Sequence, residues 1–177
     1  MKKKTMIGLS MITVAGVLLA GVLNFKKTHA GDLNIAVAPN GIAFPKDYKD
    51  WRIIAPSYRT DNNTMRVILG NDAAIKAARA GRTSPWPDGS ILAKLVWKNK
   101  KDENWDGAIV PGNFVHAEFM FKDTGKYADT GGWGYARWLG EQQKPYGDDA
   151  SFVEECHTCH TVVKESDYVF TNPVRLR

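Results

Sequence analysis

Both cysteines of the 177-residue chain fall in one short motif, in which two residues separate Cys156 from Cys159 and His160 follows directly. Three kinds of chemistry use this spacing: a thiol–disulfide redox pair, part of a zinc site, and the covalent attachment of a c-type haem. In the third, the two thiols add to the two vinyl groups of one porphyrin, and the histidine becomes an axial ligand of the iron. The residues around the motif have to decide between these interpretations.

The redox and zinc interpretations lack the sequence context that they need. A thioredoxin-like pair lies within a βαβ unit, and the preceding segment 144–155 is not typical of one. Structural zinc takes four ligands, but there is no second C-x-x-C pair, and His116 is the only histidine outside the motif and the N-terminal leader. The haem interpretation explains all three motif residues. We therefore expect one haem c, bound covalently through Cys156 and Cys159, with His160 as the iron ligand.

The N-terminal segment has the pattern of an export signal. Three lysines precede an apolar run over residues 6–25, and residues 28–30 end in the small residue Ala30, as in a secretory signal that is cleaved after that position. The apolar run is also long enough for an uncleaved anchor, so residues 1–30 are predicted to be a signal peptide or an N-terminal anchor. Export agrees with the haem interpretation, because haem c is attached outside the cytoplasm. We expect a periplasmic protein, on the membrane only if the leader is retained.

The charge balance argues against a nucleic-acid partner. The whole chain has 24 basic and 19 acidic residues and a net charge of +5. Five of its lysines lie in residues 1–30, which contain no acidic residue, so the rest of the chain is formally neutral. A nucleic-acid-binding domain carries an excess of basic residues, and we expect no nucleic-acid partner.

The elements that must position the motif are predicted to be mainly strands. Alternation of apolar and polar residues and β-rich composition predict strands over residues 64–70, 90–98, 113–122, 131–139 and 166–173, with a polar loop over 99–107. A helix is predicted over residues 71–81, with Asn71 or Asp72 as its N-cap and Gly81 at its end. This pattern predicts an α+β fold, predominantly an antiparallel β-sheet with a few helices. We expect a single haem-c domain over residues 44–177, preceded by a flexible leader segment over residues 31–43.

The motif and the order of these segments resemble the cytochrome P460 family and its relatives, the β-sheet cytochromes c′. The resemblance rests on six stretches: FPKDYKDW (44–51), PDGSILAKLVWK (87–98), FMFKDT (119–124), GGWGYARW (131–138), CHTCH (156–160) and SDYVF (166–170). It implies an antiparallel β domain, a periplasmic homodimer, and a five-coordinate haem whose distal face is open to nitrogen oxides.

The resemblance also implies two catalytic residues. Family members called P460 bond a lysine nitrogen to a meso carbon of the porphyrin and oxidise hydroxylamine, and Lys94 occupies the position of that lysine. Lys94 alternates with Leu92 and Val96, and burial would favour its neutral, nucleophilic amine, although a lysine can also cover an apolar face with its stem alone. Oxidation of hydroxylamine needs a proton acceptor, and Asp149, shortly before the motif, is the candidate base. An acid in such a turn often only caps the loop.

Three functions remain open on these residues. The leading hypothesis is a periplasmic cytochrome that oxidises hydroxylamine to N2O or NO and passes electrons to another periplasmic cytochrome. The alternative is a cytochrome c′-like protein that binds or scavenges nitric oxide without turnover. A more distant alternative is a simple electron-transfer cytochrome with Met65, Met120 or His116 as the second axial ligand.

Overall fold

The computed structural model describes residues 34–175, so the predicted leader over residues 1–30 lies outside the described part. The described residues belong to one compact unit. Its elements, in chain order, are η1 (Tyr48–Asp50), β1 (Arg52–Arg59), β2 (Thr64–Gly70), α1 (Asp72–Arg79), β3 (Ile91–Lys101), β4 (Ile109–Lys122), η2 (Ala128–Thr130), β5 (Trp133–Leu139), β6 (Lys144–Pro145), α2 (Phe152–Thr161) and η3 (Lys164–Ser166). Between residues 34 and 175, no helix is long and apolar enough to cross a membrane.

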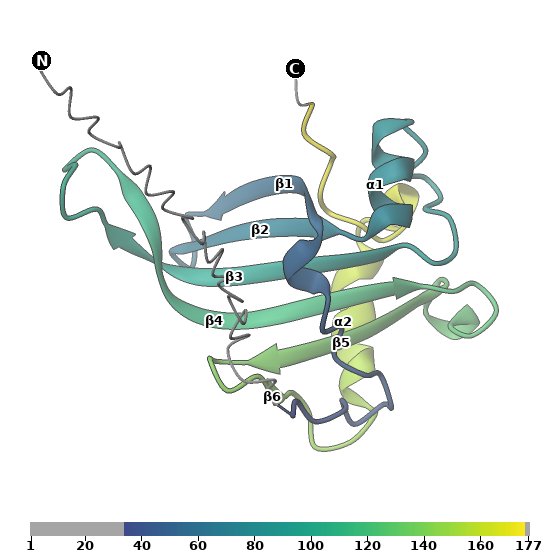
Figure 1. The fold of residues 1–177 in the computed structure, drawn as a ribbon. Coiled ribbons are helices and arrows are strands. Elements are labelled where there is room, and N and C mark those ends of the chain that lie inside the picture. The colour runs from purple at the N-terminus through teal and green to yellow at the C-terminus, as the bar shows by residue number, and fades with distance from the viewer. Residues whose placement is uncertain (1–33, 176–177) are drawn as a thin grey trace, which may run out of the picture. The chain divides into compact units, whose positions relative to one another are not determined.

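The strands form one six-stranded antiparallel sheet in which each strand pairs with its neighbour in the chain, in the order β1 to β6 (Figure 1). Antiparallel neighbours need no crossover between parallel strands, and the longer connections contain helices: α1 lies between β2 and β3, and η2 lies between β4 and β5. Helix α2 lies across one face of the sheet, and the segment before β1 lies across the other (Figure 1). The predicted fold class, a predominantly antiparallel α+β domain, is confirmed.

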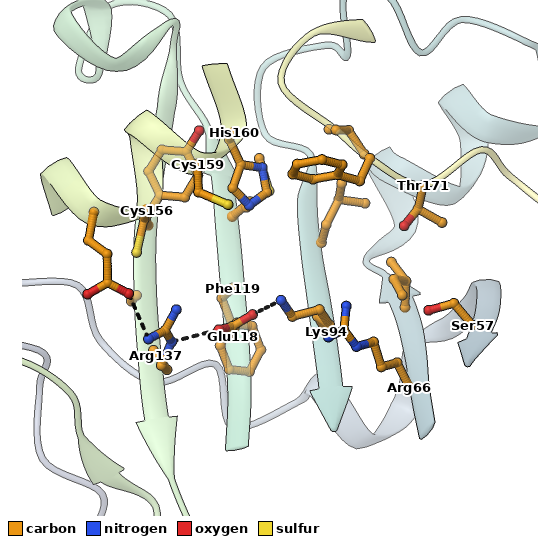
Figure 2. Close-up of a pocket in the computed structure, with 18 of the residues that line it drawn as sticks. Ser57, Arg66, Lys94, Glu118, Phe119, Arg137, Cys156, Cys159, His160 and Thr171 are labelled. Atoms are coloured by element: carbon orange, nitrogen blue, oxygen red, sulfur yellow. Dashed lines mark hydrogen bonds and ion pairs between the residues drawn. The ribbon is translucent and has the colours of Figure 1, made fainter. Parts of the chain in front are cut away.

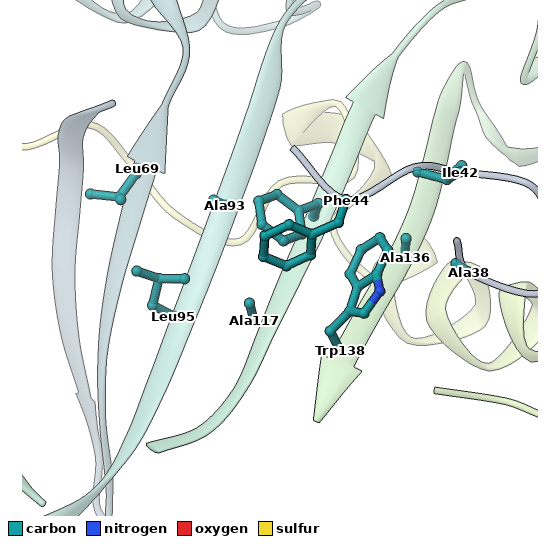
Figure 3. Close-up of a cluster of buried hydrophobic side chains, with 10 residues drawn as sticks. Ala38, Ile42, Phe44, Leu69, Ala93, Leu95, Ala117, Ala136 and Trp138 are labelled. Atoms are coloured by element: carbon teal, nitrogen blue, oxygen red, sulfur yellow. The ribbon is translucent and has the colours of Figure 1, made fainter. Parts of the chain in front are cut away.

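A separate apolar core lies on each face, because side chains alternate along the strands. On the first face, Leu69, Ala93, Ala117, Phe119 and Trp138 pack against the segment that precedes β1 (Figure 3). On the second face, an apolar cluster joins the sheet to α1, and Val153 and Cys156 of α2 pack against it. Its members are Ile54, Ile68, Ala74, Ile75, Ala77, Trp86, Leu92, Trp133, Tyr135 and Val169. The second face is the one that carries the site described below.

Residues 34–43 differ from the predicted flexible leader segment. Ala38 and Ile42 are buried in the core of the first face. The indole of Trp138 donates a hydrogen bond to the carbonyl oxygen of Ala36 at 2.9 Å, and the amide of Asn40 donates to that of Tyr135 at 2.8 Å. Burial of these two apolar side chains and the two hydrogen bonds fix the segment on the sheet, so the packed domain begins before residue 44.

Helix α1 begins as predicted. The side chain of Asn71 accepts a hydrogen bond from the backbone N–H of Ala74 at 3.0 Å, which is the usual N-cap contact. The same oxygen also accepts from the N–H of Ile91 at 3.1 Å, and the Asn71 amide donates to the carbonyl of Gly89 at 2.8 Å. One side chain therefore starts α1 and joins it to the beginning of β3.

Two parts of the predicted strand pattern were wrong. Residues 166–173 form no strand, because Asp167 and Tyr168 both have left-handed backbones, with φ angles of 51° and 63°. Strand β1, over Arg52–Arg59, was not predicted, since it contains Pro56 and little alternation. Its place at the edge of the sheet explains why a proline is tolerated there.

Candidate functional site

A cavity of about 620 Å³ lies between the second face of the sheet, α2 and residues 169–171 (Figure 2). Cys156, Cys159 and His160 line it from α2, and Lys94 lines it from β3. Residues three and four apart lie on the same side of a helix, so α2 presents all three motif residues to the cavity. The structure thus brings together the motif and the lysine, which lie more than sixty residues apart in the sequence.

The imidazole of His160 is held by one backbone group. Its Nδ1 lies 2.6 Å from the carbonyl oxygen of Tyr168. Since a carbonyl only accepts, Nδ1 carries the proton, and Nε2 is the nitrogen with a free lone pair. Burial lowers the pKa of His160, although the contact with Tyr168 opposes this shift. The ring is therefore neutral and has the tautomer that a metal-binding histidine needs.

The electrostatics of Cys156 do not suit a redox-active thiol. Burial raises the pKa of Cys156 to about 11, whereas reactive cysteines have a pKa below the usual range. The zinc interpretation gains no support either, because residues 34–175 contain no group of three or more His, Cys, Asp or Glu side chains arranged to hold a metal ion. Neither the redox nor the zinc interpretation therefore gains support from the described residues.

A row of charged side chains crosses the sheet opposite the motif (Figure 2). Lys94, Glu118 and Arg137 are direct cross-strand partners on β3, β4 and β5. Glu118 forms an ion pair with Lys94, and its Oε1 accepts a hydrogen bond from Arg137 Nε at 2.6 Å. Burial alone would raise the pKa of Glu118, but the charges of Lys94 and Arg137 outweigh it and hold that pKa well below its usual range. Glu118 is thus an ionised anchor for two cations of the cavity wall.

The second acid of the cavity is Glu155, which the sequence analysis missed. Its Oε1 lies 3.3 Å from Arg137 Nη1, and its Oε2 accepts a hydrogen bond from the Tyr146 hydroxyl at 2.7 Å. The Glu155 side chain is 57% exposed, so it joins the cavity to solvent. The available signal was its spacing, because Glu155 lies four residues before Cys159 and residues four apart share one side of a helix.

Asp149 lies elsewhere. It is exposed in the loop before α2, and its Oδ1 accepts a hydrogen bond from the backbone N–H of Ser151 at 2.8 Å. Asp149 is not among the residues that line the cavity. The geometry therefore gives no support to Asp149 as the base and shows the loop-capping contact instead.

Among the side chains considered as a second axial ligand, Met120 lines the cavity, whereas Met65 and His116 do not. His116 Nε2 lies 3.5 Å from Glu118 Oε1. Burial lowers the pKa of His116 to about 4, so this ring is neutral at neutral pH. His116 thus lies beside Glu118 on the same strand, and of these two side chains only Glu118 lines the cavity.

The cavity fits a haem in three respects. Part of its wall is apolar, formed by Ile68, Leu92, Met120, Val169 and Phe170, as a porphyrin ring requires. Arg59, Arg66, Lys94 and Arg137 also line the cavity, and these cations suit the propionate groups of a porphyrin. Two polar atoms of the lining, Arg66 Nε and the Tyr135 hydroxyl, are buried without a hydrogen-bond partner among the described residues. Buried polar atoms usually have partners, so both are suited to a bound group.

A family model described as Cytochrome P460 matches residues 45–171 of the chain, from just before η1 to the far end of the cavity lining. No curated protein matches the chain.

Proposed function

Because the chain belongs to the cytochrome P460 family and is thus a c-type haem cytochrome of that family, we propose that it is a periplasmic enzyme that oxidises hydroxylamine. The observation that carries the proposal is the joint presence of the C-x-x-C-H motif, Lys94 and a solvent-linked carboxylate, Glu155, around one cavity. We further propose a homodimer with a periplasmic cytochrome as electron acceptor, as the family resemblance implies.

Three residues of α2 would hold one haem. Cys156 and Cys159 would form the covalent thioether bonds, and His160 would bind the iron through Nε2, the nitrogen that the Tyr168 contact leaves free. When bound, the haem supplies an iron centre that binds a small nitrogen compound and accepts its electrons. The chain's own part is to position the substrate and to remove its protons.

We assign proton removal to Glu155. Oxidation of hydroxylamine releases protons together with electrons, so the cavity needs an acceptor that can pass protons to solvent. Glu118 is poorly suited, since two cations hold its pKa well below the usual range. Glu155 lines the cavity, is more than half exposed, and is held by the Tyr146 hydroxyl and Arg137. Glu155 therefore replaces Asp149 in this role.

Lys94 is the proposed cross-linking residue, and its surroundings favour one rival function. A lysine bonds to carbon as the neutral amine, whereas Lys94 forms an ion pair with Glu118 in this structure. A protein in which this pair persists would keep an ordinary haem c and would bind or scavenge nitric oxide without turnover. Whether Lys94 keeps its ion pair with Glu118 or bonds to the haem therefore distinguishes the nitric-oxide-binding protein from the enzyme.

The test uses the protein exported from a host that attaches haem c. We expect an intact mass that includes one haem, reduction of a dye acceptor by hydroxylamine, and a ferrous absorption band far to the red of ordinary haem c. Lys94→Ala should abolish the displaced band, whereas Lys98→Ala, at an exposed position of the same strand, should leave it unchanged. An ordinary haem c spectrum without turnover, unchanged in Lys94→Ala, would transfer the assignment to nitric oxide binding.

A further inference from the structure

A buried ion pair lies outside the cavity, at the end of β4. Lys122 Nζ lies 2.7 Å from Asp167 Oδ1, and the two side chains are 2% and 10% exposed. Taking two charges out of water is costly, and apolar residues of similar size often stabilise a core as well or better. Net stability is therefore a poor explanation for this pair, and its geometry suggests another role.

Asp167 uses all three of its oxygens to join separate parts of the fold. Oδ1 accepts from Lys122 Nζ, and Oδ2 accepts from the backbone N–H of Trp86 at 2.7 Å. Its carbonyl oxygen accepts from the indole of Trp133 at 2.8 Å. The position of residue 167 is thus fixed from β4, from the loop before β3 and from β5.

Lys122 is equally constrained. Its ammonium also donates to the carbonyl of Gly131 at 3.2 Å and lies 5.0 Å from the centre of the Trp133 ring, which is a cation–π distance. The Tyr168 ring packs directly over Gly131, where no side chain would fit. Lys122 therefore holds both Asp167 and the turn on which Tyr168 rests.

The next carbonyl along the chain is the one that orients His160. Asp167 and Tyr168 are both left-handed, a backbone conformation that non-glycine residues adopt only when their surroundings impose it. In this conformation the Tyr168 carbonyl oxygen lies 2.6 Å from His160 Nδ1. The contacts of Asp167 supply the constraint, since they fix the residue immediately before Tyr168.

We propose that the Lys122–Asp167 pair is a positioning device for the axial ligand, acting through the Tyr168 carbonyl on the imidazole of His160. This inference rests on the proposed ligation of haem by His160. A hydrogen bond from Nδ1–H to a fixed acceptor makes Nε2 a stronger donor to the metal and fixes the ring orientation. A stronger donor favours the oxidised iron, so the pair lowers the reduction potential of the site.

The test is made on the haem-loaded protein with Lys122→Met, which removes the charge and keeps the length of the side chain. We expect the iron–histidine stretching band of the ferrous protein to move to lower frequency and the reduction potential to rise. Asp167→Asn, which retains an acceptor for the Trp86 N–H, should shift both in the same direction by less. Lys122→Arg keeps the charge and should restore both values toward those of the wild type.

A matched control separates positioning from general destabilisation. Ile75 lies on α1 in the apolar cluster of the second face, which also contains Trp86 and Trp133. Ile75→Val should lower the melting temperature without moving the iron–histidine band or the reduction potential. If Lys122→Met and Asp167→Asn also lower only the melting temperature, the pair is structural and the inference is wrong. A wild-type protein without an iron–histidine band would refute it as well. Absence of hydroxylamine turnover, by contrast, would refute the proposed function and leave the band shift to decide this inference.

Discussion

Glu118 is expected to be coupled energetically to Arg137, and a double-mutant cycle measures that coupling. Arg137 contacts three groups: Glu118 at 2.6 Å, Glu155 at 3.3 Å, and the ring of Tyr146, whose centre lies 4.4 Å from the guanidinium carbon. Arg137→Met removes all three contacts, and Glu118→Gln removes only the charge at the first. A double-mutant cycle cancels the free-energy changes that each substitution causes independently of the other. What remains is the free energy of the Glu118–Arg137 interaction.

The size of the coupling follows from burial. The side chains of Glu118 and Arg137 are 17% and 21% exposed, so solvent screens the pair only in part. A hydrogen bond to a charged group contributes about 1.5–3 kcal/mol, and an exposed ion pair contributes at most about 1 kcal/mol. We therefore expect a coupling free energy of about 2 kcal/mol. Glu118→Gln alone should cost more, since it also leaves the cation of Lys94 without its partner.

The assay is denaturant unfolding of the haem-loaded protein, followed by far-ultraviolet circular dichroism, for the wild type, both single variants and the double variant. A matched control is Arg52→Met with Asp72→Asn, an ion pair whose side chains are 46% and 99% exposed. Its coupling should stay below about 0.5 kcal/mol. A Glu118–Arg137 coupling no larger than that of this exposed pair would refute the view that the charged row holds the cavity wall.

Three further outcomes are expected. Glu155→Gln should lower the rate of hydroxylamine oxidation by about 10²–10³-fold with little change in the haem spectrum, whereas Asp149→Asn should leave the rate within about twofold of the wild type. Burial lowers the pKa of His116 from 6.5 to about 4, so the folded state binds this proton less readily than the unfolded chain. The free energy of unfolding should therefore fall by about 2–3 kcal/mol between pH 6.5 and pH 4, and His116→Gln should flatten that slope in pH-dependent unfolding curves. Ile42→Ala should cost about 2–4 kcal/mol in denaturant unfolding, because Ile42 is 6% exposed; a cost near zero would contradict the packing of residues 34–43 on the sheet.

The sequence predicted the elements whose signal is local. Alternation along residues 64–70 and 131–139 identified β2 and β5, and Asn71 marked the start of α1, because each depends on neighbours within a few residues. The motif was recognised from local spacing as well, but helix α2, which carries it, was not predicted. Family resemblance added Lys94, whose approach to α2 depends on the register of β3 in the sheet.

The failures concern contacts between distant segments. The run over residues 166–173 has strand-like composition, but the contacts of Asp167 with β4, β5 and Trp86 impose left-handed backbones. Asp149 and Glu155 both precede the motif closely, and only the path of the loop decides which carboxylate lines the cavity. The position of Glu155 depends on two residues that hold it: Arg137 of β5, and Tyr146 of the loop after β6.

Strand β4 combines both kinds of information. Alternation along β4 places Glu118, Met120 and Lys122 on the second face. The sequence therefore already contained a lysine at the end of the strand that carries Glu118, on the same face. A lysine at the end of a strand usually extends into solvent, and only Asp167, 45 residues further along, makes burial of its charge tolerable. Glu118 holds the cations opposite the motif, while Lys122 holds the segment that orients His160. One face of one strand therefore contacts both sides of the cavity. We expect substitution of Glu118 to change the surroundings of Lys94. Substitution of Lys122 should instead change the donor strength of His160, the proposed haem ligand.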